Sequence, residues 1–264
     1  MQRIFYYLRL VFLFVRMSFS SQLEYRINFI SGVLVESGYM CIKLTYLVVV
    51  IRAGSNIGTL TPDMILIFIG TYIFMTGIWM LLEGLNSLPN AIFKGQLDLV
   101  LTKPCSPLFL QVSSAFNFGM LLPNFVGGLI VIVFGWSRSG IPSTAFNVLG
   151  FTFWICCGIF LTYGIVSICM MLAFWITSFN GINTLFAAFW DFNNMPMEIY
   201  PKMFRQIGTF IIPVFMITNW PGLFVLKSLA WEQIIWGIML PVLLLFISFA
   251  MWRSGLRRYS SANG

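Results

Sequence analysis

Apolar residues follow one another along this chain in long runs, and charged residues fall between the runs. Residues 64–82 form a stretch of 19 residues without a charge, bracketed by Asp63 and Glu83. About 20 apolar residues in a helix cross the hydrocarbon core of a bilayer. The pattern therefore predicts one all-α polytopic membrane domain, residues 1–264, with six transmembrane helices at 27–51, 64–82, 111–135, 146–176, 204–220 and 233–252.

The basic residues orient these spans, because cytoplasmic loops carry an excess of Lys and Arg. With the N-terminus in the cytoplasm, eleven basic residues are cytoplasmic (Arg3, Arg9, Arg16, Arg26, Lys94, Lys103, Lys202, Arg205, Arg253, Arg257, Arg258), three are outside (Arg52, Arg138, Lys227) and Lys43 is within a span. The charge-free stretch 139–190 has room for two spans, but a second one would reverse this bias. We therefore expect residues 180–192 to lie along the cytoplasmic face of the membrane. Both termini are expected in the cytoplasm.

Two segments differ from ordinary spans. Residues 1–26 are basic and aromatic, and their longest apolar run, 10–15, is too short for a signal peptide. They predict an N-terminal interfacial helix. Near the fifth span, Pro213 and the Pro221-Gly222 pair interrupt an apolar helix. Broken backbone at membrane depth must be buried in protein or line a cavity, so we expect a re-entrant hairpin near the outer face.

The composition excludes several classes of protein. Hydrophobic residues make up 59% of the chain and charged residues 9%, which rules out a water-soluble globule. There is no histidine, and the five cysteines form no C-x-x-C pair, so no catalytic triad and no metal site is expected. The net charge of +7 is accounted for by topology, and no nucleic-acid partner is expected.

Two sets of residues within the spans are candidates for function. Gly70, Gly77 and Gly84 recur at heptad spacing and let another helix approach closely, either within the chain or at a subunit interface. Glu36 and Lys43 share a face of the first span, and ionisable groups at this depth are candidates for function by default. They either take a direct part in transport or meet partners on other helices.

The cytoplasmic segment 83–107 contains a predicted short amphipathic helix. Ser87 can cap it, Pro89 suits its first turn and Gly95 can end it. Its apolar positions are Leu85, Leu88 and Ile92, and its polar positions are Asn86, Asn90 and Lys94. By these features alone it is either a membrane-resting loop or a docking surface.

Residues 92–104 resemble the I-x-x-G-x-L-D-x-x-L-x-[KR]-P signature of bacterial type-2 ABC (ABC-2) transporter permeases. Residues 191–201, with Ile212-Pro213 and Asn219-Trp220-Pro221, resemble a second run of that family, P-x-x-I-[FY]-P followed by I-P-x-x-x-x-x-[YN]-x-P. Both motifs occur in the family's order. The resemblance implies a non-catalytic permease subunit of an exporter, with a cytoplasmic coupling helix and re-entrant helices after the fifth span.

The resemblance also implies partners: two separate ATP-binding subunits, a second permease that is identical or related, and the surrounding membrane lipids. This chain has no P-loop, so ATP and magnesium would be bound in the partner ATPase and no cofactor in this chain. The implied coupling residues are Leu85, Leu88, Asn90, Ile92, Lys94, Gly95, Leu97, Asp98, Lys103 and Pro104, and the candidate pathway residues are Phe210, Phe215, Thr218 and Asn219.

Three alternatives remain open at this point. An ion-coupled secondary transporter or channel would use Glu36 and Lys43. A membrane-embedded enzyme is disfavoured by the absence of histidine and of paired acidic residues. A structural subunit without a pathway would support ATPase coupling without cargo-stimulated turnover.

Overall fold

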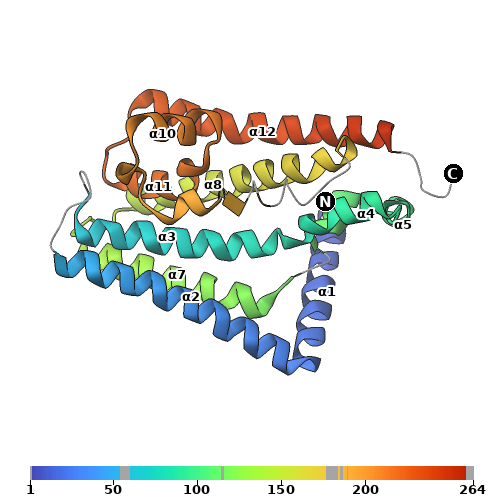
Figure 1. The fold of residues 1–264 in the computed structure, drawn as a ribbon, viewed down its shortest axis with the longest axis horizontal. Helices are drawn as coiled ribbons and strands as arrows, with labels where there is room; N and C mark the ends of the chain where they lie inside the picture. Colours follow the sequence, from blue (N-terminus) through green and yellow to red (C-terminus); the bar gives the residue numbers. More distant parts are fainter. Residues whose placement is uncertain are drawn as a thin grey trace.

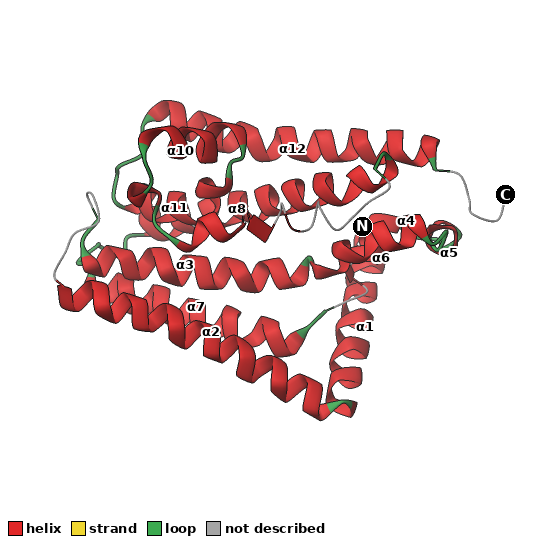
Figure 2. Ribbon diagram, viewed as in Figure 1, coloured by secondary structure: helices red, strands yellow, loops and turns green. Residues whose placement is uncertain are grey.

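The structure, a computed structural model, describes residues 2–53, 60–113, 116–176, 184, 187, 188 and 190–259. The regular structure of these residues is helical (Figure 2), which confirms the predicted all-α polytopic class. Six helices are long and apolar enough to cross a membrane: α1 (Gln2–Glu24), α2 (Arg26–Ala53), α3 (Pro62–Leu81), α7 (Phe118–Arg138), α8 (Ala145–Met171) and α12 (Trp231–Arg258).

Five of these helices run alongside one another, and α1 lies crosswise at one end of the bundle (Figure 1). That orientation agrees with the predicted interfacial helix. The same end holds η1 (Glu83–Ser87), α4 (Leu88–Phe93), α5 (Leu97–Leu101) and α6 (Pro107–Ser113), and we call it the α4 end. The opposite end holds α10 (Lys202–Gln206), and we call it the α10 end.

Helices α3 and α7 form the closest pair in the bundle, because glycines on each helix face the other. A Cβ added to Gly70 would lie 2.7 Å from the Ile132 backbone nitrogen, and one added to Gly77 would lie 3.0 Å from that of Phe125. In return, a Cβ on Gly135 of α7 would lie 2.7 Å from Leu66 Cβ. Gly70 and Gly77 therefore pack within the chain, which is one of the two roles that their spacing allows.

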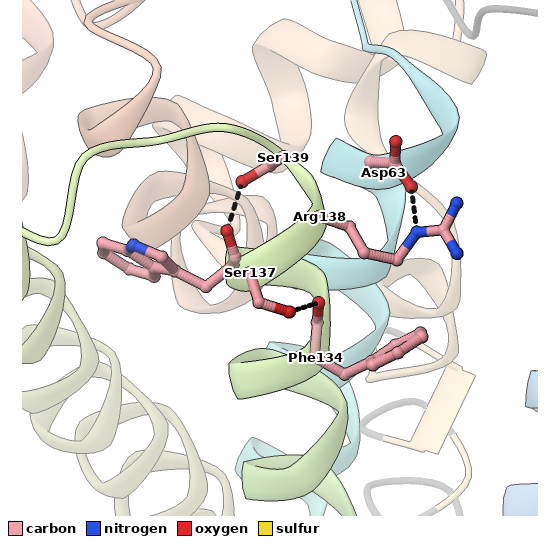
Figure 3. A network of polar contacts seen from close by, with 6 residues as sticks. Asp63, Phe134, Ser137, Arg138 and Ser139 are labelled. Atoms are coloured by element: carbon pink, nitrogen blue, oxygen red, sulfur yellow. Dashed lines mark hydrogen bonds and ion pairs between the residues drawn. The ribbon is translucent and has the colours of Figure 1, made fainter.

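An ion pair joins the same two helices at the α10 end. The Arg138 side chain reaches from α7 to α3, where its Nε donates to Asp63 Oδ1 at 2.9 Å (Figure 3). The hydroxyls of Ser137 and Ser139 donate to carbonyls of their own helix, one turn back. They satisfy carbonyls at the C-terminal end of α7, where intrahelical donors run out.

The main core lies between α3, α8, α12 and α11 (Val214–Val225). Trp220 of α11 is fully buried and meets Trp154 of α8 edge to face, with ring centroids 5.3 Å apart. The buried hydroxyls of Ser167 and Ser248 lie 2.8 Å apart and link α8 to α12 by a hydrogen bond. Such interhelical bonds hold helices together where lipid provides no hydrophobic drive.

The predicted third span, 111–135, is wrong at its start. Gln111 belongs to the separate short helix α6, and the spanning helix α7 begins at Phe118. The Asn117 side chain accepts a hydrogen bond from the Met120 backbone nitrogen and so caps α7. Hydropathy alone cannot locate this boundary, because apolar residues continue on both sides of it.

The predicted fifth span, 204–220, is not one continuous helix. The chain bends by 100° between residues 202–211 and 214–225, at the predicted break at Pro213. Ile212, with φ −123° and ψ 87°, leaves the helical region that a following proline disfavours. The break expected at Pro221 is absent, because α11 continues through it to Val225. An interior proline costs about 3 kcal/mol, and the burial of nearly the whole of α11 offsets that cost.

The placement of Lys202 and Arg205 on the same side as the N-terminus is also wrong. Both belong to α10, at the end of the bundle opposite α4 (Figure 1). Nine basic residues then lie at the α4 end (Arg3, Arg9, Arg16, Arg26, Lys94, Lys103, Arg253, Arg257, Arg258) and five at the α10 end (Arg52, Arg138, Lys202, Arg205, Lys227). The charge bias keeps its direction but is weaker.

The expectation that 180–192 lies along one face of the bundle is wrong for its described C-terminal part. The Trp190 ring packs on that of Trp79 of α3, with centroids 4.4 Å apart. Asp191 lines a pocket together with Lys43 of α2 and Tyr72 of α3, both of which lie well inside their helices and away from the helix ends. Residues 180–183, 185, 186 and 189 lie outside the described residues. The charge-based argument failed here because it took 204–220 as the fifth crossing.

Candidate functional site

The segment between α3 and α6, residues 83–106, forms a projection at the α4 end of the bundle that is anchored by three leucines. Leu85, Leu88 and Leu97 are each at most 1% exposed and belong to the main core, with Met170 and Met171 of α8. Burying a leucine contributes about 1.5–3 kcal/mol. These three predicted coupling residues therefore hold the projection on the bundle and do not form its outer surface.

The outer surface of the projection mixes apolar and polar side chains. Leu99 is 70% exposed, Phe93 is 41% exposed, and Leu101 is exposed beside them. The predicted residues Asn90, Lys94, Lys103 and Pro104 are also exposed, and Ile92 is half-buried. Sequence reasoning missed Phe93 and Leu99. Each is an apolar residue two positions after a buried one, Ala91 or Leu97, and this spacing is a signal that α4 and α5 also have an outward apolar face.

Gly95 and Asp98 have local roles in the projection. Gly95 has a φ of 67° and turns the chain between α4 and α5, a conformation that suits glycine. Ser87 does not cap α4 as expected, because its hydroxyl donates to the Gly84 carbonyl. At the end of α12, burial together with the nearby Asp98 raises the pKa of Tyr259. Asp98 therefore faces α12.

Helix α1 is attached to the same region at two points. Near its start, the Tyr7 hydroxyl accepts a hydrogen bond from the Ser106 backbone nitrogen at 3.3 Å, and the Tyr7 ring packs on Phe109. Near its end, Gln22 Oε1 accepts from the backbone nitrogens of Phe118 and Gly119. A helix N-terminus has unsatisfied N–H groups, and here a side chain from another helix supplies their acceptor.

A second polar site lies among α2, α3 and the 187–194 segment. It is a pocket of about 490 Å³ whose lining includes Glu36, Lys43, Tyr72, Asp191 and Asn194. Such a volume is within the range that accommodates small molecules. Polar groups from three segments that are distant in sequence therefore converge at membrane depth.

Glu36 and Lys43 have different partners in this pocket. Glu36 is 8% exposed, and its Oε2 accepts a hydrogen bond of 2.8 Å from Asn124 Nδ2 of α7. The Lys43 ammonium lies 4.2 Å from the centre of the Tyr72 ring, a cation–π arrangement. Glu36 and Lys43, both described residues, form no ion pair with each other.

The four predicted pathway residues do not line a common path. Phe215, Thr218 and Asn219 are buried, and only Phe210 is exposed. Thr218 Oγ1 donates to Asn193 Oδ1 at 3.1 Å, and Asn219 Oδ1 accepts from the Met197 backbone nitrogen at 2.9 Å. The polar residues of α11 thus hold the 192–197 segment, because a buried polar group needs a partner. The assignment of the four residues to a pathway stays a prediction.

The chemistry of these sites is that of binding and conformational change. Among the described residues, no group of three or more His, Cys, Asp or Glu side chains could hold a metal ion. The features brought together are an exposed projection, a helix attached to it, and a polar pocket at membrane depth.

Comparison with known proteins agrees with this arrangement. A family model described as ABC-2 family transporter protein matches residues 38–263, which is most of the chain. Neither the curated proteins nor the solved structures contain a match.

Proposed function

Since this chain belongs to the ABC-2 family of transporter proteins, and so is a permease of an ABC transporter, we propose that it works as an exporter driven by separate ATP-binding subunits. Two such subunits, which bind ATP and magnesium, dock at the α4 end. A second permease, identical or related, completes the transport path. The α4 end and both termini are cytoplasmic, in a bacterial inner membrane, in keeping with the nine basic residues at that end.

The observation that supports this proposal is the exposed surface of α4 and α5, which is anchored to the bundle by buried leucines. Phe93 and Leu99 present large apolar side chains to the aqueous side, next to Lys94. Exposed apolar groups at the centre of a polar rim are typical of protein interfaces. Behind them, the buried Leu85, Leu88 and Leu97 anchor the projection to the bundle. The projection would therefore keep its place on the bundle when an ATP-binding subunit presses on it.

A push on this surface has a direct route into the membrane domain. α3 leads directly into the projection through η1, and α7 follows the projection after α6, so both helices of the glycine-packed pair are connected to it. Closure of the ATP-binding subunits would therefore move α3 and α7 as one body. The permease pair would have two states, one open to the cytoplasm and one open to the outside. These states differ in their contacts with the ATP-binding subunits.

The pocket of Glu36, Lys43 and Asp191 supports a place for the cargo path beside α2 and α3. The alternative in which Glu36 and Lys43 couple transport to an ion gradient is less well supported, because Glu36 already has a partner in Asn124.

Co-purification with the ATP-binding subunit tests the proposal. The variants Phe93→Ser and Leu99→Ser each remove an exposed apolar group, and interface anchors of this kind contribute about 2 kcal/mol or more. We expect at least a tenfold loss of bound ATPase. Ile199→Ser, a change of similar kind at the half-exposed Ile199 of the α10 end, is the control and should bind normally. Flux through reconstituted permease without nucleotide, or unchanged ATPase binding in both variants, would overturn the proposal.

A further inference from the structure

A polar cleft opens at the α4 end between α1, the projection and the start of α7. Its volume is about 510 Å³, and seven of its eight lining side chains are polar. They include Asn28, Glu83, Asn86, Asn90 and Asn117, and the eighth is Phe116. We call it the amide cleft.

Several polar groups of the amide cleft have no partner in the protein. Within the described residues, the side chains of Asn28, Glu83, Asn86 and Asn90 form no hydrogen bond, and Asn86 Oδ1 is buried without a donor. Buried polar atoms are nearly always paired, so Asn86 is a lining residue whose hydrogen-bonding capacity the protein leaves partly unused. Both walls are held by hydrogen bonds to other elements: Gln22 Oε1 accepts from the Phe118 backbone nitrogen of α7, and the Ser87 hydroxyl accepts from Gln111 Nε2 of α6.

The types of lining residue define the ligand. An amide side chain both donates and accepts, as a hydroxyl does, and several amides around one ring suit a hydroxyl-rich molecule. Among the described residues, no Lys or Arg lines the cleft, so it does not suit phosphate or sulfate. Phe116 is the one apolar residue in this described lining, and it offers a flat face for a sugar ring but no set of pockets for peptide side chains.

Glu83 fits the same ligand. Burial first, and then the negative charge of Glu36, raise the pKa of Glu83 above its ordinary value. A carboxyl group with a raised pKa keeps its proton to a higher pH. In that form it can donate a hydrogen bond to a hydroxyl oxygen, and it is a weaker ligand for a metal cation. One carboxyl is also fewer than calcium sites normally use.

We propose that the amide cleft binds a neutral, hydroxyl-rich head group, of the saccharide class, and loads it for transport. This inference rests on the proposed function, since it names the class of cargo. Because Glu83, Asn86 and Asn90 belong to η1 and α4, an occupant of the cleft touches the same segment on which the ATP-binding subunit would dock.

Equilibrium binding to the purified permease in lauryldimethylamine oxide micelles tests the proposal without any ATPase. The probes are maltose, as a free saccharide, and dodecyl maltoside, as a membrane-anchored one. We expect saturable binding of dodecyl maltoside, weakened about tenfold by Asn86→Leu or by Asn90→Ala, since each removes a hydrogen-bonding amide. Asn86→Leu replaces an unpartnered acceptor by an apolar group of similar shape, and Asn90 is exposed, so both variants should fold.

The control is Gln206→Ala, which removes an exposed amide at the α10 end and should bind as the parent does. Competition by free maltose would support a soluble saccharide, and variant-sensitive binding of dodecyl maltoside without such competition would support a glycolipid head group. Equal affinity in the parent and both cleft variants, no saturable binding of either probe, or stronger competition by a dodecyl phosphate or a short peptide would overturn the inference. None of these outcomes changes the expected loss of ATPase binding in Leu99→Ser, so the two proposals can fail separately.

Discussion

The substitution Gly70→Ala tests whether the glycines of α3 serve packing within the chain. The new Cβ would lie 2.7 Å from the Ile132 backbone nitrogen, 2.9 Å from Ile132 Cγ1 and 3.0 Å from the Val131 carbonyl carbon. Ordinary contacts of a Cβ begin near 3.4 Å. The helices must therefore separate by several tenths of an ångström, and overpacking of this kind costs about 1–3 kcal/mol.

A matched control comes from Gly38 of α2, around which an added Cβ finds nothing within 4 Å. Gly38→Ala should be neutral or stabilising by up to about 1 kcal/mol, which is the helix propensity of alanine over glycine. The difference between the two variants isolates the packing term. Truncating Ile132 to Ala beside Gly70→Ala should restore only part of the stability, because the closest atom belongs to the α7 backbone.

The assay is reversible unfolding in mixed micelles of increasing dodecyl sulfate content, followed by circular dichroism at several protein concentrations. Equal stability of Gly70→Ala and Gly38→Ala would refute the packing assignment. A loss that appears only on dilution would instead place Gly70 at the interface with a second subunit.

Three further predictions concern polar groups. Asp63→Asn, which breaks the exposed pair with Arg138, should lower the unfolding free energy by no more than about 1 kcal/mol, and high salt should abolish the difference. Asn124→Leu leaves the buried Glu36 without its hydrogen-bond donor and should lower the unfolding free energy by about 1.5–3 kcal/mol. In a double-mutant cycle, adding Glu36→Met should recover most of this loss, and additive losses would refute the pairing. Because the pKa of Glu83 is raised from its ordinary 4.5, the folded chain retains a proton that the unfolded chain has lost, so the unfolding free energy falls as the pH rises above 4.5. Glu83→Gln should flatten this fall, which unfolding titrations between pH 4.5 and neutrality would measure.

The extent of several helices could be predicted from charge and proline placement. Charges bracket α3 closely, and the residue before Pro213 leaves the helical region, which a following proline disfavours. The start of α7 could not be predicted in this way, because an Asn117 cap and a Gln22 acceptor from another helix define it. Tertiary contacts of that kind leave no mark on a hydropathy profile.

The sequence predicts a short helix in the projection but not which of its side chains face outward. The motif in 92–104 identifies the projection, yet Leu97 within it is a core anchor while Leu99 is exposed. Helices of five or six residues are too short for apolar periodicity to assign a face. The orientation of Lys202 and Arg205 failed for a different reason. The positive-inside rule places loops correctly only when each apolar run is one straight crossing, and the run that includes α11 bends by 100°.

The contacts of α2 connect the docking surface to the polar pocket. Most of α2 is exposed, and its polar attachments to the bundle are few: Glu36 bonds to Asn124 of α7, and Lys43 lies over Tyr72 of α3. Both attachments lead to the α3–α7 pair, which is connected to the projection through η1 and α6. A displacement of α3 and α7 by a docked motor would therefore act on α2 through these two polar contacts, both of which line or adjoin the pocket. A chain in which they were severed should still bind an ATPase, but the motion of that ATPase would no longer reach the pocket.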